Sequence, residues 1–296
     1  MLKKPSPAAH GLSFLSLTIL FFLVFMVYPI TFSVILSFFK WKGYSPNPFE
    51  NFIGLANYRR MINARIFWQS LKNTFVFVLG SLVLQNLFGF LAAIFLFYAD
   101  LRSSIVWKAI LFFPCLLSAV VVGIVFRRIF LQNGLFNLMI RLFFSNYQGF
   151  SWLGNLVTPI YVVIFVSVWK WFGYNMVIYY AGLQSLDEQI TESAKIDGAS
   201  WLVIIIRIVI PQLYKTISMA VILNIIGGFK VFDIVYVMTG GGPTHASEVL
   251  TSYVYYHSFS LYGTNLMGYA SSLAVTLTVI VLFFAVLRLW VDKKAF

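Results

Sequence analysis

Asp187-Glu-Gln-Ile-Thr-Glu192-Ser-Ala-Lys-Ile-Asp197-Gly198-Ala-Ser-Trp201-Leu-Val-Ile-Ile-Ile-Arg207-Ile-Val-Ile-Pro211-Gln-Leu213 is a polar and then briefly apolar stretch inside an otherwise apolar chain. Four of the nine acidic residues lie within its first eleven positions. The apolar run that follows has only ten residues, which as a helix cover about 15 Å, roughly half of a hydrocarbon core. This stretch therefore predicts a surface beside a membrane rather than a crossing.

Local signals divide the same stretch into two short helices. Ser185 and Glu188 have the spacing of a capping box, which predicts a helix start there. Gly198 is a natural stop for that helix, and a second helix is expected from Trp201 to a break at Pro211. The pattern favours a helix-turn-helix lying at the membrane, followed by a separate span.

Composition places the whole chain in the polytopic membrane class. Hydrophobic residues make up 60% of the 296 residues and charged residues 10%, and the mean hydropathy is +0.88. A soluble protein is excluded by these values. The formal charge of +12 comes from scattered basic residues without a nucleic-acid recognition motif, so phospholipid headgroups are the expected counter-charges. The lone Cys115 lies in an apolar run and is expected to pack there.

Apolar stretches long enough to cross a bilayer predict an all-α protein with a single domain, 1–296, and six transmembrane helices. The expected spans are 12–38, 74–97, 105–126, 157–183, 216–238 and 266–291, with a cytoplasmic segment at 185–213. The first span follows Lys3 and Lys4 and has no cleavage site, so it is expected to stay as an anchor with both chain termini in the cytoplasm. Basic residues divide ten to nine between the two sides and do not decide the orientation.

No motif for catalysis or for energy conversion is present. A Gly-Lys-Ser/Thr phosphate loop is absent, so the chain is not expected to hydrolyse ATP. The three histidines are far apart and the chain has one cysteine, so no metal site is predicted either. An enzyme is therefore a poor hypothesis.

Charged and amide side chains inside the expected spans point to a possible pathway, because such groups are costly in lipid unless they face protein or water. Two readings stay open for them: a translocation lumen suited to sugar hydroxyls, or structural contacts. The structural contacts would be a snorkelling Lys170 and an ion pair of Lys230 with Asp233 on one helical face. Gln85 and Asn86 fit helix packing. The candidate pathway residues are Lys170, Tyr174, Asn175, Asn224, Lys230 and Asp233.

Three motifs in order resemble a known family. Glu192-Ser-Ala-Lys-Ile-Asp-Gly198-Ala, with Ile210-Pro211, is similar to the EAA loop of permease subunits in bacterial binding-protein-dependent carbohydrate ABC importers. Ser193 stands where that loop usually has Ala. The other two matches are Phe229 to Pro243 and Gly54-Leu-Ala-Asn-Tyr58-Arg.

The resemblance implies a type I ABC importer permease fold of the maltose and glycerol-phosphate type, with cytoplasmic coupling helices. It also implies a heteromer in the bacterial inner membrane: a second homologous permease subunit, two ATPase subunits that bind ATP and Mg²⁺, and an extracytoplasmic binding protein that delivers a sugar. Gly240 to Pro243 would touch that binding protein or form a flexible turn. The implied ATPase-docking residues are Glu188, Glu192, Ser193, Ala194, Asp197, Gly198 and Pro211.

Without the family resemblance, the residues are also compatible with other functions. An ion-coupled secondary transporter or channel would use its own intramembrane charges for coupling. A scaffold without a pathway would leave those charges structural, and the acidic stretch would then be an amphipathic surface helix. Dependence on ATP and on partner chains separates these readings.

Overall fold

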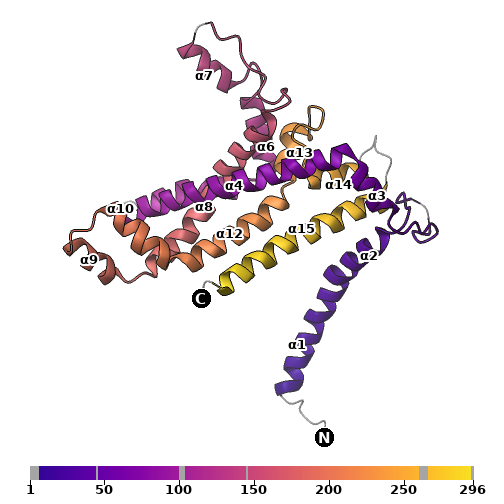
Figure 1. The fold of residues 1–296 in the computed structure, drawn as a ribbon, viewed down its shortest axis with the longest axis horizontal. Coiled ribbons are helices and arrows are strands. Elements are labelled where there is room, and N and C mark those ends of the chain that lie inside the picture. The colour runs from indigo at the N-terminus through magenta and orange to yellow at the C-terminus, as the bar shows by residue number, and fades with distance from the viewer. Residues whose placement is uncertain (1–6, 45, 100–103, 145, 260–265, 295–296) are drawn as a thin grey trace. The chain divides into compact units, whose positions relative to one another are not determined.

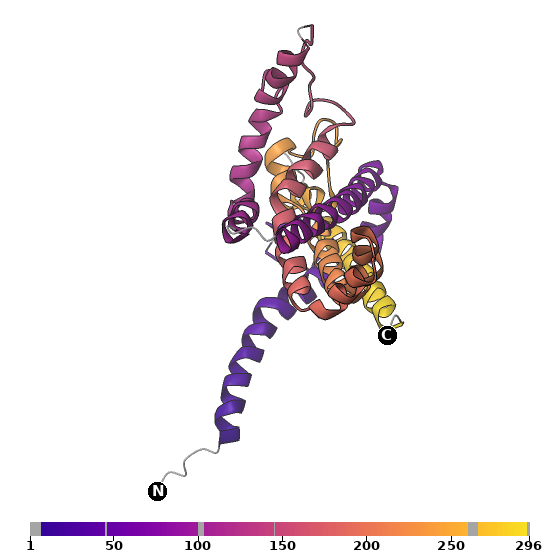
Figure 2. The same cartoon turned by 90° about the vertical axis from the view of Figure 1, so that its left-hand side faces the viewer.

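The computed structural model describes residues 7–44, 46–99, 104–144, 146–259 and 266–294. Within these ranges the chain is helical, and the only β-type pairing is an isolated bridge between Phe39 and Phe52. The helices divide into two compact units, one formed by 1–65 with 254–279 and the other by 66–253 with 280–296. Figure 1 and Figure 2 show the helices in two views.

The smaller unit begins with a long apolar helix. Helix α1 (Pro7–Phe22) continues through a π-helical turn, η1 (Leu23–Val27), into α2 (Tyr28–Leu36). The short α3 (Ala56–Asn63) follows, and Asn57 donates from Nδ2 to the carbonyls of Ser37 and Phe39 at 2.8 and 3.0 Å. This unit also holds part of α14 (Leu250–Phe259) and the first half of α15 (Met267–Lys294).

The larger unit contains the remaining helices and the second half of α15. Helix α4 (Arg65–Tyr98) has 34 residues, or about 51 Å, and so is longer than a hydrocarbon core. Helix α8 (Pro159–Gln184) packs against α4 and α5 at two glycines that carry no side chain into the contact. A Cβ at Gly89 would lie 2.6 Å from Asn175 Cβ, and one at Gly173 would lie 2.1 Å from the Leu111 carbonyl oxygen. Small residues thus allow close helix approach, as is usual in membranes.

The span expected over 105–126 is two helices rather than one. Helix α5 (Ser104–Leu116) and helix α6 (Ala119–Ile129) meet at 91°. Ser118 begins α6, because its hydroxyl accepts a hydrogen bond from Val120 N at 3.3 Å. Helix α5 packs on α8, whereas α6 packs on α13 (Asp233–Thr239) and leads to α7 (Leu135–Phe143).

The span expected over 216–238 is also interrupted. Helix α12 (Tyr214–Phe229) ends before residues 230–232, and α13 begins at Asp233. Before α12, the short elements α9 (Glu188–Ile196), α10 (Trp201–Ile204), η2 (Ile205–Val209) and α11 (Ile210–Gln212) form the polar interruption of the chain. Among the described residues, four helices are long and apolar enough to cross a membrane, and up to six crossings result if two bent pairs, α5 with α6 and 201–212 with α12, each count as one.

Two buried apolar clusters hold the larger unit together. One joins α4, α6, α8 and α13 around Phe77, Val163 and Val235. The other joins α4, α8 and α12 to the interruption through Ile204, Val209 and Leu213, all at most 1% exposed. The expected coupling segment 185–213 is therefore packed into the same core as α8 and α12, which carry several of the candidate pathway residues.

Candidate functional site

The polar helix α9 begins at a cap different from the one expected. Asp187 is the cap, and its Oδ1 accepts a hydrogen bond from Gln189 N at 3.0 Å. Ser185 instead ends α8, where its hydroxyl donates to the Gly182 carbonyl at 2.7 Å. The predicted capping box of Ser185 and Glu188 is wrong, because the serine is engaged by the preceding helix.

Gly198 stops α9 in the predicted way. Its φ of +78° is left-handed, Gly198 N donates to the Lys195 carbonyl, and Ala199 N donates to the Ala194 carbonyl, both at 3.0 Å. These two bonds make a Schellman motif, which satisfies the last carbonyls of a helix and favours glycine. A Cβ at Gly198 would meet nothing within 4 Å, so the backbone conformation rather than space requires glycine.

The outer face of α9 is open. Glu192, Ser193 and Asp197 are exposed, whereas Ala194 is half-buried against the second cluster. The side chain of Glu188 lies outside the described residues. This arrangement leaves the carboxylates of Glu192 and Asp197 exposed, whereas the Ser193 hydroxyl donates to the Gln189 carbonyl at 2.8 Å and Ala194 packs the helix against the core.

The second part of the interruption is longer than expected. Pro211 was expected to break the helix, but the helical turns continue to Gln212 and bend by 72° at Leu213 before α12. Pro211 is tolerated because it stands in the first turn of α11, directly after the π-helical turn η2. Trp201 at the start of α10 contacts Tyr98 at the end of α4, with 4.2 Å between ring centroids.

A cavity of about 470 Å³ lies in the larger unit, between α4, α8, α12 and α13. Five of the six candidate pathway residues line it, namely Lys170, Tyr174, Asn224, Lys230 and Asp233. Asn175 is not in the wall, but its side chain and that of Asn224 bond each other, the shorter bond being 2.9 Å from Asn224 Nδ2. The structure thus brings these candidates together at one place.

Lys170 is a structural member of this wall rather than a snorkelling residue. It is 3% exposed, and its Nζ donates to the carbonyls of Pro114, Cys115 and Leu117 at 3.4, 3.0 and 2.6 Å. These carbonyls end α5, where a cation is favoured by the helix dipole. Because an ammonium has three N–H groups, these bonds occupy all of them.

Lys230 and Asp233 do not lie on one continuous helical face. Residues 230–232 are not helical, so the spacing that brings i and i+3 side chains together does not apply. The expected ion pair between Lys230 and Asp233 is not found in the part of the chain that the structure describes. Both Lys230 and Asp233 are exposed where they border the cavity.

Several wall residues were not singled out from the sequence. Phe77 and Ser81 precede Gln85 on α4 at intervals of four, so one helical face supplies all three. Gln85 is also a packing residue, as its sequence context predicts, because its Nε2 donates to Ser167 Oγ at 3.3 Å. The periodicity through Gln85 was a usable signal. The other wall residues not predicted are Ala119, Ser167, Trp171, Leu223, Gly227, Gly228, Val231, Phe232 and Ile234.

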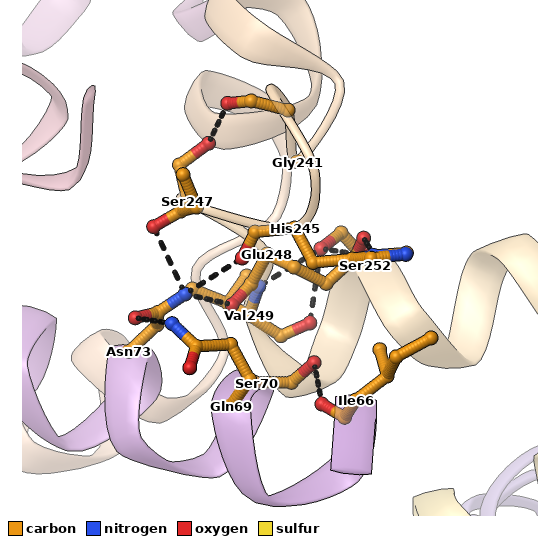
Figure 3. Close-up of polar contacts among 12 residues, drawn as sticks. Ile66, Gln69, Ser70, Asn73, Gly241, His245, Ser247, Glu248, Val249 and Ser252 are labelled. Atoms are coloured by element: carbon orange, nitrogen blue, oxygen red, sulfur yellow. Dashed lines mark hydrogen bonds and ion pairs between the residues drawn. The ribbon is translucent and has the colours of Figure 1, made fainter. Parts of the chain in front are cut away.

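The loop after α13 is compact rather than a flexible turn. Figure 3 shows Asn73 of α4 pointing into it, where Nδ2 donates to the carbonyls of His245, Ala246 and Glu248 at 3.2, 3.1 and 2.9 Å. The Glu248 carboxylate is buried and binds His245 Nδ1 at 2.8 Å and the Ser252 hydroxyl at 2.9 Å. A polar network therefore fixes the shape of 239–252 against α4.

Comparison with known proteins identifies the family. The family model described as binding-protein-dependent transport system inner membrane component matches residues 85–296. The chain belongs to this family. It is 33% identical over 91% of its length to the probable ABC transporter permease protein YurN of Bacillus subtilis, and covers 91% of that protein.

Two further likenesses agree with this assignment. The arabinooligosaccharides transport system permease protein AraP of Bacillus subtilis is 31% identical over 97% of this chain, and the chain covers 88% of AraP. The fold is that of a chain in a bacterial alginate ABC transporter in complex with an alginate pentasaccharide-bound periplasmic protein. The TM-score is 0.81 at 20% identity, with 96% of this chain and 93% of that chain covered.

Family membership decides between the readings left open by the residues. This chain is a multi-pass membrane permease subunit of a binding-protein-dependent ABC importer, with a type I permease fold. A self-contained secondary transporter, a scaffold and an enzyme are set aside, because members of the family are transport-system components.

Proposed function

We propose that the chain supplies one part of a sugar pathway in an ABC importer, and that the 470 Å³ cavity belongs to that pathway. The observation that carries the proposal is the polar and aromatic wall inside a permease whose relatives are named for saccharides: arabinooligosaccharides for AraP and lactose for LacF of Rhizobium radiobacter. Trp171 and Tyr174 offer ring faces for sugar C–H groups, and Gln85 and Asn224 offer amides for hydroxyls.

The charges of the wall divide between structure and solute. Lys170 is occupied by backbone carbonyls and leaves no N–H for a sugar. Lys230 and Asp233 are exposed toward the cavity and would bind hydroxyl groups through charge-assisted hydrogen bonds. Because the charges of Lys230 and Asp233 are opposite, a neutral or weakly charged sugar fits this pair best.

Movement of the ATPase subunits during ATP hydrolysis would be transmitted to this cavity through the coupling segment 185–213. Two partner ATPase subunits, which bind ATP and Mg²⁺, would dock on the exposed Glu192, Ser193, Asp197 and Gly198. The packing of Ile204, Val209 and Leu213 against α8 and α12 would carry their movement to the cavity wall. Ala194 and Pro211 hold the segment in shape, and Glu188 belongs to the same docking surface.

The remaining partners and the orientation follow as parts of the same proposal. Six spans in one membrane domain would place both chain termini and the coupling segment in the cytoplasm. The compact loop 239–249 would then face the extracytoplasmic binding protein that delivers the sugar. A second homologous permease subunit would complete the pathway.

Reconstitution tests the transport function as a whole. The chain is purified with its candidate partner subunits, placed in liposomes, and assayed for ATP hydrolysis with the binding protein and a panel of sugars. We expect stimulation that requires both the binding protein and one class of sugar. Sugar flux through this chain alone, without ATP, would overturn the proposal.

A matched pair of glycine variants tests the docking role. Gly198 and Gly240 both have left-handed φ, +78° and +59°, and a Cβ at either would meet nothing within 4 Å. Gly198→Asp should abolish ATP-driven uptake and lower co-purification of the ATPase while membrane insertion persists. Gly240→Asp carries similar backbone strain and should leave the ATPase bound. Equal ATPase binding in both variants would remove the docking role.

A further inference from the structure

Helix α7 turns its polar residues inward. Asn137 and Arg141 are four positions apart and so share one face. Asn137 is fully buried: its Nδ2 donates to the carbonyls of Leu131, Gln132 and Phe150, at 3.2, 3.0 and 2.8 Å. Arg141 Nη2 donates to the Gln148 carbonyl at 3.0 Å. Both polar side chains of α7 therefore bind backbone carbonyls of the connection that surrounds the helix.

Asn137 also binds the residues that lead from α7 back to α8. Its Oδ1 accepts hydrogen bonds from the Tyr147 hydroxyl at 2.8 Å and from Trp152 Nε1 at 2.9 Å. One buried amide thus joins both sides of the segment between α6 and α8. The segment is a folded unit that holds α7 in a defined orientation.

The outward face of α7 is apolar. Leu135, Leu138, Met139 and Leu142 follow the i, i+3, i+4, i+7 pattern of one helix face, and all four are exposed. Leu142 and the adjoining Phe143 are each 83% exposed. A helix in water shows the reverse arrangement, and an apolar patch of this kind marks a surface that is covered by something else.

Two observations indicate lipid as the cover. The preceding helix α6 also exposes apolar residues, Val121, Ile124 and Val125, and Figure 1 shows α7 beyond the end of α6 and away from α4 and α12. The charge is complementary to anionic headgroups, because no acidic residue occurs from 101 to 186, while Arg127 and Arg128 are exposed at the end of α6. Anionic surfaces attract such basic groups near an inserted apolar helix.

We propose that α7 is an interfacial helix that inserts its Leu135–Leu142 face into an anionic membrane surface, at the side of the membrane where α6 ends. Arg127 and Arg128 bind lipid phosphates beside it, and the aromatic rings of Phe143 and Phe144 lie at the boundary of the acyl chains. The connection from α6 to α8 is thereby fixed to the bilayer. This inference does not depend on the nature of the transported solute.

A fluorescent probe at single cysteines tests the position of α7. In a Cys115→Ser background, which keeps a donor to the Lys170 carbonyl, bimane is attached to Leu142→Cys on the apolar face or to Gln148→Cys, an exposed control in the same segment. The whole transporter is reconstituted in vesicles of zwitterionic lipid with or without an anionic phospholipid. Quenching by lipid carrying a nitroxide on the acyl chain is compared with quenching by aqueous iodide.

We expect lipid nitroxide to quench position 142 at least about twofold more than position 148, and iodide to show the opposite preference. Arg127→Gln with Arg128→Gln should lower lipid quenching at 142 in anionic vesicles to its value in zwitterionic vesicles. Iodide quenching at 142 equal to that at 148 would overturn the proposal. So would protection from both quenchers that is lost when the binding protein is omitted, since a protein would then cover the face. Leu138→Cys repeats the test if Leu142→Cys does not assemble.

Discussion

Lys170 and Lys230 border the same cavity and have opposite surroundings. Lys170 lies at the break between α5 and α6, where its ammonium donates hydrogen bonds to three carbonyls at the end of α5. Lys230 lies at the break between α12 and α13, is exposed, and forms no ion pair with Asp233 in the described structure. One helix interruption holds a buried lysine, and the other leaves its lysine exposed at the border of the cavity. The burial and hydrogen bonding of a charged residue in an apolar stretch thus depend on its local geometry, which its sequence context does not reveal.

Lys170→Met would break this comparison most strongly. The methionine fills a similar volume but leaves the carbonyls of Pro114, Cys115 and Leu117 without their donor in a buried place. Loss of hydrogen bonds from a charged group predicts destabilisation by about 3 kcal/mol. The thermal midpoint of the purified subunit complex in detergent measures it. Lys230→Met is the control and should keep the parent midpoint; an unchanged midpoint in Lys170→Met would show that the break does not need the ammonium.

Gly173→Ala tests the packing that presents Lys170 to the break. The new methyl group would lie 2.1 Å from the Leu111 carbonyl oxygen, so α5 and α8 must move apart. Such overpacking predicts a loss of about 2 kcal/mol, read from the same thermal midpoint. Gly227→Ala is the matched variant in α12, where a Cβ would meet nothing within 4 Å. Equal midpoints for these two variants would contradict the close approach of α5 and α8.

Thr251→Val tests the other interruption. The Thr251 hydroxyl donates to the Val231 carbonyl, inside the non-helical residues 230–232. Removal of this bond predicts a loss of about 1 kcal/mol, because one neutral hydrogen bond is involved. Thr251→Ser keeps the hydroxyl and should retain more of the stability than valine. A valine variant as stable as the parent would show that the break between α12 and α13 does not need this bond.

Lys230→Gln tests the role of Lys230 in sugar transport, and of these variants it should have the smallest effect on stability. An exposed side chain without an ion pair predicts no change in the thermal midpoint. If the cavity carries sugar, loss of a charge-assisted hydrogen bond should raise the half-maximal sugar concentration of ATPase stimulation about tenfold. Sugar stimulation identical to that of the parent would place the solute away from Lys230.

The sequence was a good guide to the cavity, for a physical reason. Polar groups in apolar helices face the protein interior or water, so Tyr174, Asn224 and Asp233 were expected to share a location without knowledge of the fold. The same rule could not separate Lys170 from Lys230. That distinction depends on where the end of α5 lies, and this is a contact between segments about 55 residues apart.

The interruptions of the helices were harder to predict. Hydropathy counts apolar residues and does not respond to a 91° bend, so 105–126 was expected to be one span. Ser118 inside that apolar run was a usable signal, since it caps α6. Likewise, spacing rules for Lys230 and Asp233 assumed an unbroken helix. At α9 the acidic composition and Gly198 were informative, whereas the exact cap depended on how α8 ends at Ser185.

Asn73 gives the loop after α13 a tolerance to sequence change. The groups that it binds at 245, 246 and 248 are backbone carbonyls, which every amino acid carries. The loop can therefore exchange exposed side chains such as Thr244 while its path over α4 persists. One amide on α4 thus lets the outer surface of this loop change without rebuilding the helix beneath it.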